Sequence, residues 1–121
     1  NQDFVSLHGT RADHVVMAGG RGNARVGVYD GAAWTTLAPS GIGGLNAVAV
    51  LPDDTAIMGG IGGYVGLFDP ETATLSHEAT LGSEAVHAAW DDGAGRTWVV
   101  GGNFAVPHQG LAFSRTLGRS P

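Results

Sequence analysis

The fold prediction rests on residues 14–34, which read HVVMAGGRGNARVGVYDGAAW. This stretch joins an apolar run, a double glycine, a polar loop, a second apolar run, a tight turn and a tryptophan. The same order recurs in residues 55–69 and again in residues 96–113. The second glycines of the three pairs stand at positions 20, 60 and 102, so the spacings are 40 and 42 residues. A period in this range, with four short strands in each unit, predicts an all-β repeat protein of the β-propeller type.

Each unit is predicted to be a meander of short strands separated by turns rich in glycine, proline and aspartate. The predicted strands are 4–9, 14–18, 25–29 and 33–37, then 46–51, 55–58, 64–68 and 74–79, then 86–90, 97–100 and 109–114. The third unit lacks an outer strand. No segment of 10 to 12 residues combines a 3.6-residue apolar period with freedom from glycine and proline, so helices are not expected. Residues 1–121 are predicted to form one partial propeller domain, with repeats 4–42, 43–83 and 84–121.

The first repeat resembles the kelch pattern, in which an apolar run and a double glycine precede two aromatic residues across a turn. It has Gly19-Gly20, then Tyr29 and Trp34. The second repeat keeps the glycine pair and places Phe68 at the tyrosine position, and the third keeps the pair and Phe113. The repeats also resemble divergent propeller repeats of secreted bacterial proteins, which implies an extracytoplasmic or secreted location. The resemblance implies an interaction module in most cases and an enzyme in a minority.

Composition excludes several classes of protein. The formal net charge is −5, lysine is absent and the six arginines are scattered, which argues against binding to nucleic acid. No apolar run approaches the roughly 20 residues that a membrane helix needs. The absence of cysteine excludes disulfides within this stretch, and also the cysteine-linked tyrosine of the kelch-shaped copper-radical oxidases.

Five histidines and two pairs of aspartates are candidate metal ligands. The histidines have no mutual i, i+2 or i+4 spacing and fall in different predicted strands, so single packed or surface histidines are expected. The pairs Asp53-Asp54 and Asp91-Asp92 occupy the same turn of repeats 2 and 3, where aspartate is an ordinary turn former. The glycine-rich loops precede no helix and therefore do not form a phosphate loop. No catalytic residue, metal or other cofactor is predicted.

The loops between the second and third strands of each repeat are the predicted ligand-binding region. In propellers they lie at the same end as the connections between repeats, and loops on a rigid scaffold commonly carry recognition. The candidate residues are Arg21, Asn23, Arg25, Tyr64, Asn103, Phe104 and His108. The tryptophans Trp34, Trp90 and Trp98 are instead predicted to pack within blades.

Three repeats cannot close a propeller of 4 to 8 blades. Each terminal blade would then expose an apolar face of about 300 Å², judged from four strands ~4.8 Å apart, and such faces are expected to be covered. The sequence therefore predicts a partner segment, from the rest of a longer protein, a second chain or a homo-oligomer, and predicts that it pairs with the edge strand 109–114. The favoured function is a binding or scaffold module. The alternatives are part of a propeller enzyme acting on glycans, or a carbohydrate-binding propeller assembled from several chains.

Overall fold

The computed structural model describes residues 3–103 and 110–116, and these residues form three antiparallel sheets. Sheet 1 has the strand order β1-β2-β3-β4, sheet 2 the order β5-β6-β7-β8, and sheet 3 the order β11-β10-β9. The strands of sheet 1 are β1 (Phe4–Arg11), β2 (His14–Gly19), β3 (Arg25–Tyr29) and β4 (Trp34–Leu37). Those of sheet 2 are β5 (Leu45–Val50), β6 (Ala56–Gly60), β7 (Tyr64–Asp69) and β8 (Thr74–Thr80), and those of sheet 3 are β9 (Ala85–Asp91), β10 (Arg96–Gly102) and β11 (Gly110–Thr116).

The all-β prediction is confirmed. The only helical element in the described part is the three-residue 3₁₀ turn η1 (Ile61–Gly63), and no described helix is long and apolar enough to cross a membrane. The predicted second strands of the three repeats correspond to β2, β6 and β10, each with a neighbour on both sides, except that Thr55 precedes β6. Three successive meanders are compatible with either a partial propeller or a layered β-sandwich.

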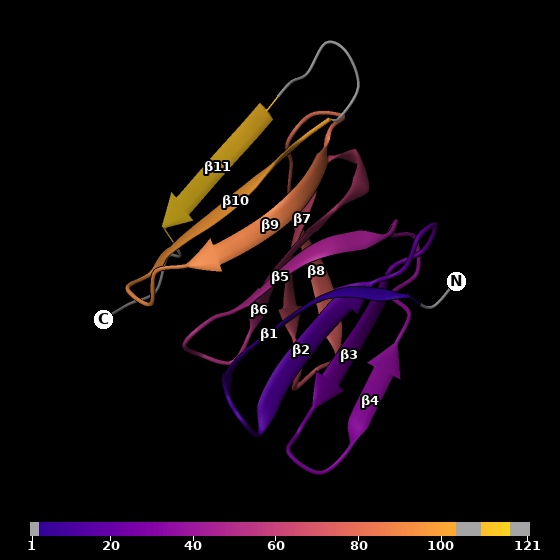
Figure 1. Cartoon of the computed structure of the whole chain (residues 1–121), viewed down its shortest axis with the longest axis vertical. Helices are drawn as coiled ribbons and strands as arrows, with labels where there is room; N and C mark the ends of the chain where they lie inside the picture. Colours follow the sequence, from indigo (N-terminus) through magenta and orange to yellow (C-terminus); the bar gives the residue numbers. More distant parts are fainter. Residues whose placement is uncertain (1–2, 104–109, 117–121) are drawn as a thin grey trace.

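The sheets follow one another in space as in the sequence, with sheet 2 between the other two (Figure 1). Their first strands, β1, β5 and β9, lie closest together at the contacts between sheets. Sheet 2 is therefore covered on both faces, and its β6 is buried at every position. A continuous run of apolar residues is expected for such a strand, because neither side of it meets water.

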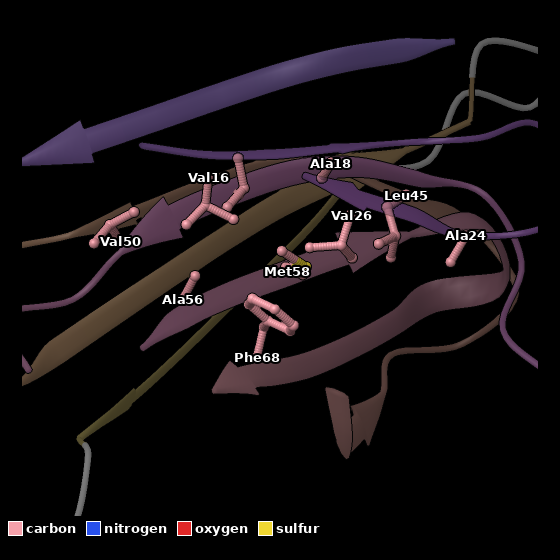
Figure 2. Packing of buried hydrophobic residues seen from close by; sticks show 10 residues of the cluster. Val16, Ala18, Ala24, Val26, Leu45, Val50, Ala56, Met58 and Phe68 are labelled. Atoms are coloured by element: carbon pink, nitrogen blue, oxygen red, sulfur yellow. The ribbon is translucent and has the colours of Figure 1, made fainter. Parts of the chain in front are cut away.

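Two apolar clusters fill the spaces between the sheets. The cluster between sheets 1 and 2 is drawn in Figure 2, and its buried members are Val16, Ala18, Ala24, Val26, Leu45, Val48, Val50, Ala56, Met58 and Phe68. The cluster between sheets 2 and 3 contains Ala47, Ala49, Leu51, Ile57, Val65, Val86 and Val99. Alternate residues of β5 and β6 thus pack on opposite sides of sheet 2, as the two-residue period of a strand requires. The central strands β2, β6 and β10 each contribute to this packing, through Val16, Met58 and Val99, which are all buried.

Strand pairing shows that the three sheets share one internal register. Corresponding rows of paired residues are His8–Val16–Val28 in sheet 1, Ala49–Ile57–Leu67 in sheet 2 and Trp90–Trp98–Ser114 in sheet 3. In the first two strands, equivalent residues of successive sheets are 41 residues apart in the chain. The equivalent glycines are therefore Gly19, Gly60 and Gly101, and the alignment of the second glycines, with spacings of 40 and 42, is wrong by one residue.

This register defines two faces for every sheet. We call the side that carries Met17, Met58 and Val99 the leading face, and the side that carries Val16, Ile57 and Trp98 the trailing face. The trailing face of sheet 1 packs on the leading face of sheet 2, and the trailing face of sheet 2 packs on the leading face of sheet 3. Both contacts between sheets therefore pair a trailing face with a leading face, so successive sheets are stacked in the same orientation.

The tryptophans differ in part from the prediction. Trp34 does lie over its own sheet, with its ring centroid 5.1 Å from that of Tyr29 on β3, but 46% of its surface stays exposed. Trp90 and Trp98 are 60% and 39% exposed. They do not pack between the described sheets, because they belong to the trailing face of sheet 3, which no described sheet covers.

Candidate ligand-binding surface at the loop end

In sheets 1 and 2, the end that carries the predicted binding loops is held by backbone hydrogen bonds between the loops and neighbouring segments of the chain. Four amide groups donate to carbonyl oxygens across this end: Gly20 to Asp3 (2.7 Å), Ala24 to Ile42 (2.8 Å), Ile61 to Gly44 (3.1 Å) and Leu81 to Gly63 (2.9 Å). The β2–β3 and β6–β7 hairpins are thereby tied to the β4–β5 and β8–β9 connections. The predicted common end for these loops is present in sheets 1 and 2.

Close backbone approach explains one of the glycines in these loops. A Cβ atom at Gly44 would lie 2.4 Å from the carbonyl oxygen of Gly20 and 2.6 Å from that of Arg21. Real Cβ atoms do not approach oxygen so closely, so a side chain here would push the β4–β5 connection away from the β2–β3 loop. The loop end is therefore held by contacts that only glycine permits.

Arg21, Asn23 and Arg25 share the β2–β3 hairpin. The guanidinium of Arg21 is 74% exposed and holds the Asp3 carboxylate, with Nε 2.9 Å and Nη2 2.8 Å from Oδ2. Asn23 is exposed, and half-buried Arg25 donates from Nη1 to the carbonyl of Ala24 at 3.1 Å. Two cations and an amide are thus displayed on one anchored loop.

Arg25 also lines a hollow of about 280 Å³ whose walls come from both β1 and β4 of sheet 1. Its other lining residues are Phe4, Thr36, Leu37 and Ala38. A cation beside an apolar floor suits a ligand with both an acceptor group and an apolar part.

Tyr64 lies differently from the other candidates. Its ring is half-buried and packs against the cluster between sheets 1 and 2, with its centroid 5.6 Å from the ring of His77. The hydroxyl is buried without a hydrogen-bond partner, and burial raises the pKa of Tyr64. Tyr64 therefore contributes packing beneath the loop end and does not present its hydroxyl to solvent.

The candidates of sheet 3 are only partly described. Asn103 follows β10 and is half-buried, at the position in sheet 3 that corresponds to the other hairpins. Phe104 and His108 lie outside the described residues. The structure thus groups three candidates on one hairpin, and places Tyr64 and Asn103 in the corresponding regions of the next two sheets.

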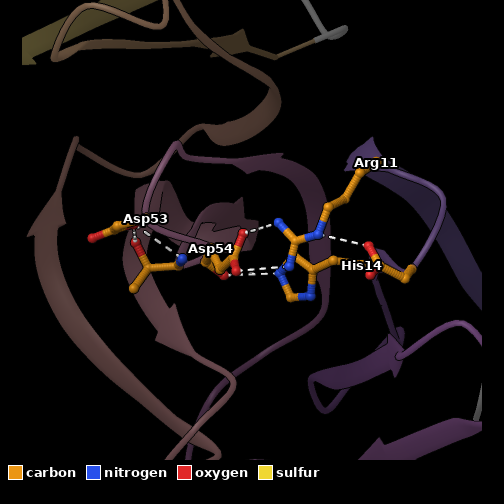
Figure 3. Close-up of polar contacts among 6 residues, drawn as sticks. Arg11, His14, Asp53 and Asp54 are labelled. Carbon is orange, nitrogen blue, oxygen red and sulfur yellow. Dashed lines mark hydrogen bonds and ion pairs between the residues drawn. The ribbon is translucent and has the colours of Figure 1, made fainter.

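The opposite end of the sheets contains a polar junction that the sequence did not indicate. Arg11, at the end of β1, forms a bidentate pair with Asp54 of sheet 2, with distances of 2.7 and 2.9 Å, and also contacts Asp13 at 2.6 Å (Figure 3). His14 Nε2 lies 2.9 Å from the carbonyl oxygen of Asp54. Asp54 itself has a positive φ of 74°, whereas Asp53 closes the turn through Thr55 as predicted for a turn former.

The ion pair determines the charge state of this junction. Hydrogen bonds from Arg11 hold the pKa of Asp54 below its usual range, and those same bonds raise the pKa of Arg11. Beside the pair lies a hollow of about 480 Å³, whose lining residues are His14, Val28, Asp30, Asp53, Asp54, Asp69, Pro70 and Glu71. In the described part of the chain, no three histidine, cysteine or acidic side chains are placed to hold a metal ion.

The four described histidines occupy separate places. The ring of His8 accepts a hydrogen bond from the Val50 amide at 2.8 Å, and His14 contacts Asp54 as above. His77 lies 2.9 Å from the Thr80 hydroxyl, and His87 lies 3.1 Å from the carbonyl of Gly102. His8 and His14 thus bond across the contact between sheets 1 and 2, which sequence spacing alone does not indicate.

Comparisons of the chain with protein families, with curated proteins and with solved structures find no match. The functional argument therefore rests on the geometry of the chain itself.

Proposed function

We propose that the chain is a non-catalytic binding or scaffold module built as part of a kelch-like β-propeller, which recognises a protein or other ligand through its loop end. The observation that carries this proposal is the repeated packing of trailing face on leading face. A contact that joins unlike faces and repeats in one direction generates a ring or a spiral of sheets. It brings the corresponding hairpins of successive sheets to one end, where they form a shared surface.

The chemistry of the loop end favours recognition. Arg21 and Asn23 are exposed on a backbone that is tied to the neighbouring connection, so little conformational freedom is lost when a ligand binds. Arginine is also enriched among the residues that dominate protein interfaces. The extracytoplasmic location implied by the repeat resemblance belongs to this proposal.

Three of the carboxyl groups are unsuited to act as the acid of a glycan hydrolase. A glycosidase needs one carboxylic acid whose pKa is raised, so that it stays protonated and donates to the leaving group. In Asp30, Asp54 and Asp92 the pKa is lowered, chiefly by hydrogen bonds from backbone amides or from Arg11. Each of these carboxyl groups is therefore stabilised as the anion, whereas the acid of a glycosidase must stay protonated.

An affinity experiment tests the proposed function. The immobilised chain is compared with an Arg21→Ala/Asn23→Ala variant in extracts of the source cells, with quantitative identification of bound protein and glycan. A Glu71→Ala/Thr72→Ala variant, changed in the exposed β7–β8 turn at the other end, is the matched control. We expect the loop variant to lose its ligand by about tenfold or more, as for interface residues worth 1–2 kcal/mol. Equal retention by all three proteins would contradict the proposal.

A further inference from the structure

Two apolar sheet faces are open in the described structure. The trailing face of sheet 3 carries Ala88, Trp90, Trp98, Val100 and Ala112, and all five are exposed. The leading face of sheet 1 carries Leu7, Val15, Met17, Tyr29 and Trp34. Leu7 is 67% exposed and Trp90 is 60% exposed. All three tryptophans of the chain thus lie on the two open faces.

The leading face of sheet 1 matches the face that sheet 2 buries. By pairing register, Met17 corresponds to Met58, Tyr29 to Phe68 and Trp34 to Leu75. Met58 and Phe68 are fully buried against sheet 1, and Leu75 packs on the same cluster. Sheet 1 therefore carries, on its open face, the kind of side chains that sheet 2 uses to pack against a preceding trailing face.

We propose that the open trailing face of sheet 3 binds the open leading face of sheet 1 in a second copy of this chain, head to tail. The inference rests on the propeller arrangement proposed above. The proposed contact packs a trailing face on a leading face, as the contacts between sheets 1 and 2 and between sheets 2 and 3 do within one chain. Since two copies supply six sheets, they fall within the range of 4 to 8 blades that close a ring.

Side-chain size at the two faces is complementary. Within the chain, His8 on the trailing face of sheet 1 reaches the amide of Val50 on the leading face of sheet 2. In the proposed contact, the residue equivalent to His8 is Trp90, and the residue equivalent to Val50 is Gly9 of the second copy. A larger side chain thus meets a position with no side chain, which favours this pairing of faces.

Charge is also complementary at the turn end. His14 of sheet 1 lies against Asp54 of sheet 2 within the chain. The equivalent residues in the proposed contact are Arg96 and, in the second copy, Asp13, whose side chain is 65% exposed. Arg96 extends along the trailing face, where its Nη1 donates to the Ser114 hydroxyl at 3.1 Å. Asp13 is held by Arg11 of its own chain at 2.6 Å, and Arg96 of the neighbouring copy would add a second cation beside it. Opposite charges therefore meet at this end of the proposed contact, as Arg11 and Asp54 do within the chain.

The open faces favour a protein partner over a sugar. The hollow between Trp90 and Trp98, lined also by Ala88, Ala89 and Val100, has a volume of about 90 Å³ and no polar side chain. A sugar needs several hydrogen-bonding groups beside the stacking ring, whereas the lining side chains of this small hollow offer only the indole N–H groups. A ring of two copies covers two faces of ~300 Å² on four-stranded sheet 1 and two of ~225 Å² on three-stranded sheet 3, in total roughly 1,050 Å², which is just above the ~1,000 Å² that a specific interface needs.

Sedimentation and light scattering of the full chain test the proposal. We expect twice the mass of the 12.3 kDa chain at micromolar concentration, and a red shift of tryptophan emission as dilution exposes the rings. Met17→Arg and Trp98→Arg should each give monomers, with Trp90→Arg as a second change on the same face as Trp98. Thr72→Arg, in an exposed turn, should stay dimeric.

Mixing the variants distinguishes a head-to-tail contact from self-pairing of like faces. A mixture of Met17→Arg and Trp98→Arg keeps one intact head-to-tail contact and should recover dimers, whereas neither variant alone does. Persistent dimers of the Met17→Arg variant alone, or a native chain that stays monomeric up to millimolar concentration, would overturn the proposal. A monomer that still binds its ligand in an Arg21-dependent way would overturn the ring and leave the proposed function standing.

Discussion

Replacing Phe68 with alanine would remove the largest fully buried side chain of the described core. Its ring lies in the cluster between sheets 1 and 2, among residues that are themselves almost inaccessible (Figure 2). An aromatic side chain buries about 150–250 Å². At ~25 cal/mol/Å² this area corresponds to roughly 4–6 kcal/mol as an upper estimate, and phenylalanine-to-alanine changes in cores typically cost about 3–5 kcal/mol. We therefore expect Phe68→Ala to lower the free energy of unfolding by about 3–5 kcal/mol.

Tyr29→Ala is the matched control, because Tyr29 occupies the equivalent position on the open leading face of sheet 1. In the dilute single chain Tyr29 is only half-buried; its ring lies beside Trp34 and its hydroxyl donates to the Gly31 carbonyl at 2.9 Å, so its loss should cost about 1–2 kcal/mol. Urea unfolding followed by circular dichroism measures both values at a concentration where the chain is monomeric. If the two variants lost equal stability there, the assignment of equivalent faces would be wrong.

Two further predictions concern the junction and the loop end. Because Arg11 lowers the pKa of Asp54, the stabilisation by this pair is complete above about pH 4, the usual pKa of an unfolded aspartate, and is lost as the pH falls further through the lowered pKa. The native chain should thus exceed Asp54→Asn in urea midpoint at pH 7, and the gap should close by about pH 2; a gap that does not change with pH would refute the assignment. Gly44→Ala should destabilise the chain through its contact with Gly20, whereas Gly22→Ala, with open space around its Cβ position, should have little effect or stabilise slightly, by about 0.4–1 kcal/mol. Thermal melting of the two glycine variants separates these outcomes, and equal melting temperatures would argue against the close approach at Gly44.

Local pattern was sufficient for the strands and for the division into three repeats. Runs such as Val26-Gly27-Val28-Tyr29 bear β-branched and aromatic residues, and glycine, proline and aspartate mark their ends. These signals act over a few residues and therefore appear directly in the sequence. The edge position of β11 in the described sheet 3 follows from the same pattern, and its pairing with another segment stays a prediction.

The register between repeats could not be obtained in the same way. The double glycines invite alignment with each other, yet strand pairing shows that Gly19 corresponds to Gly60, because the glycine pair begins one residue earlier in the register of sheet 2 than in that of sheet 1. A shift of one residue moves a side chain to the opposite face of a sheet. The residue type indicated that Trp98 packs within a blade, whereas the structure places it on the face that no described sheet covers.

Part of the candidate site could likewise be predicted from the sequence, and part could not. Strand order was sufficient to place Arg21 and Asn23 in the loop between β2 and β3, and Arg25 at the start of β3. It could not show that Tyr64 packs against the core or that Arg11 reaches Asp54, 43 residues away in the chain. Such contacts depend on how one sheet lies against the next. That arrangement results from many weak apolar contacts acting together, and no short stretch of sequence encodes it.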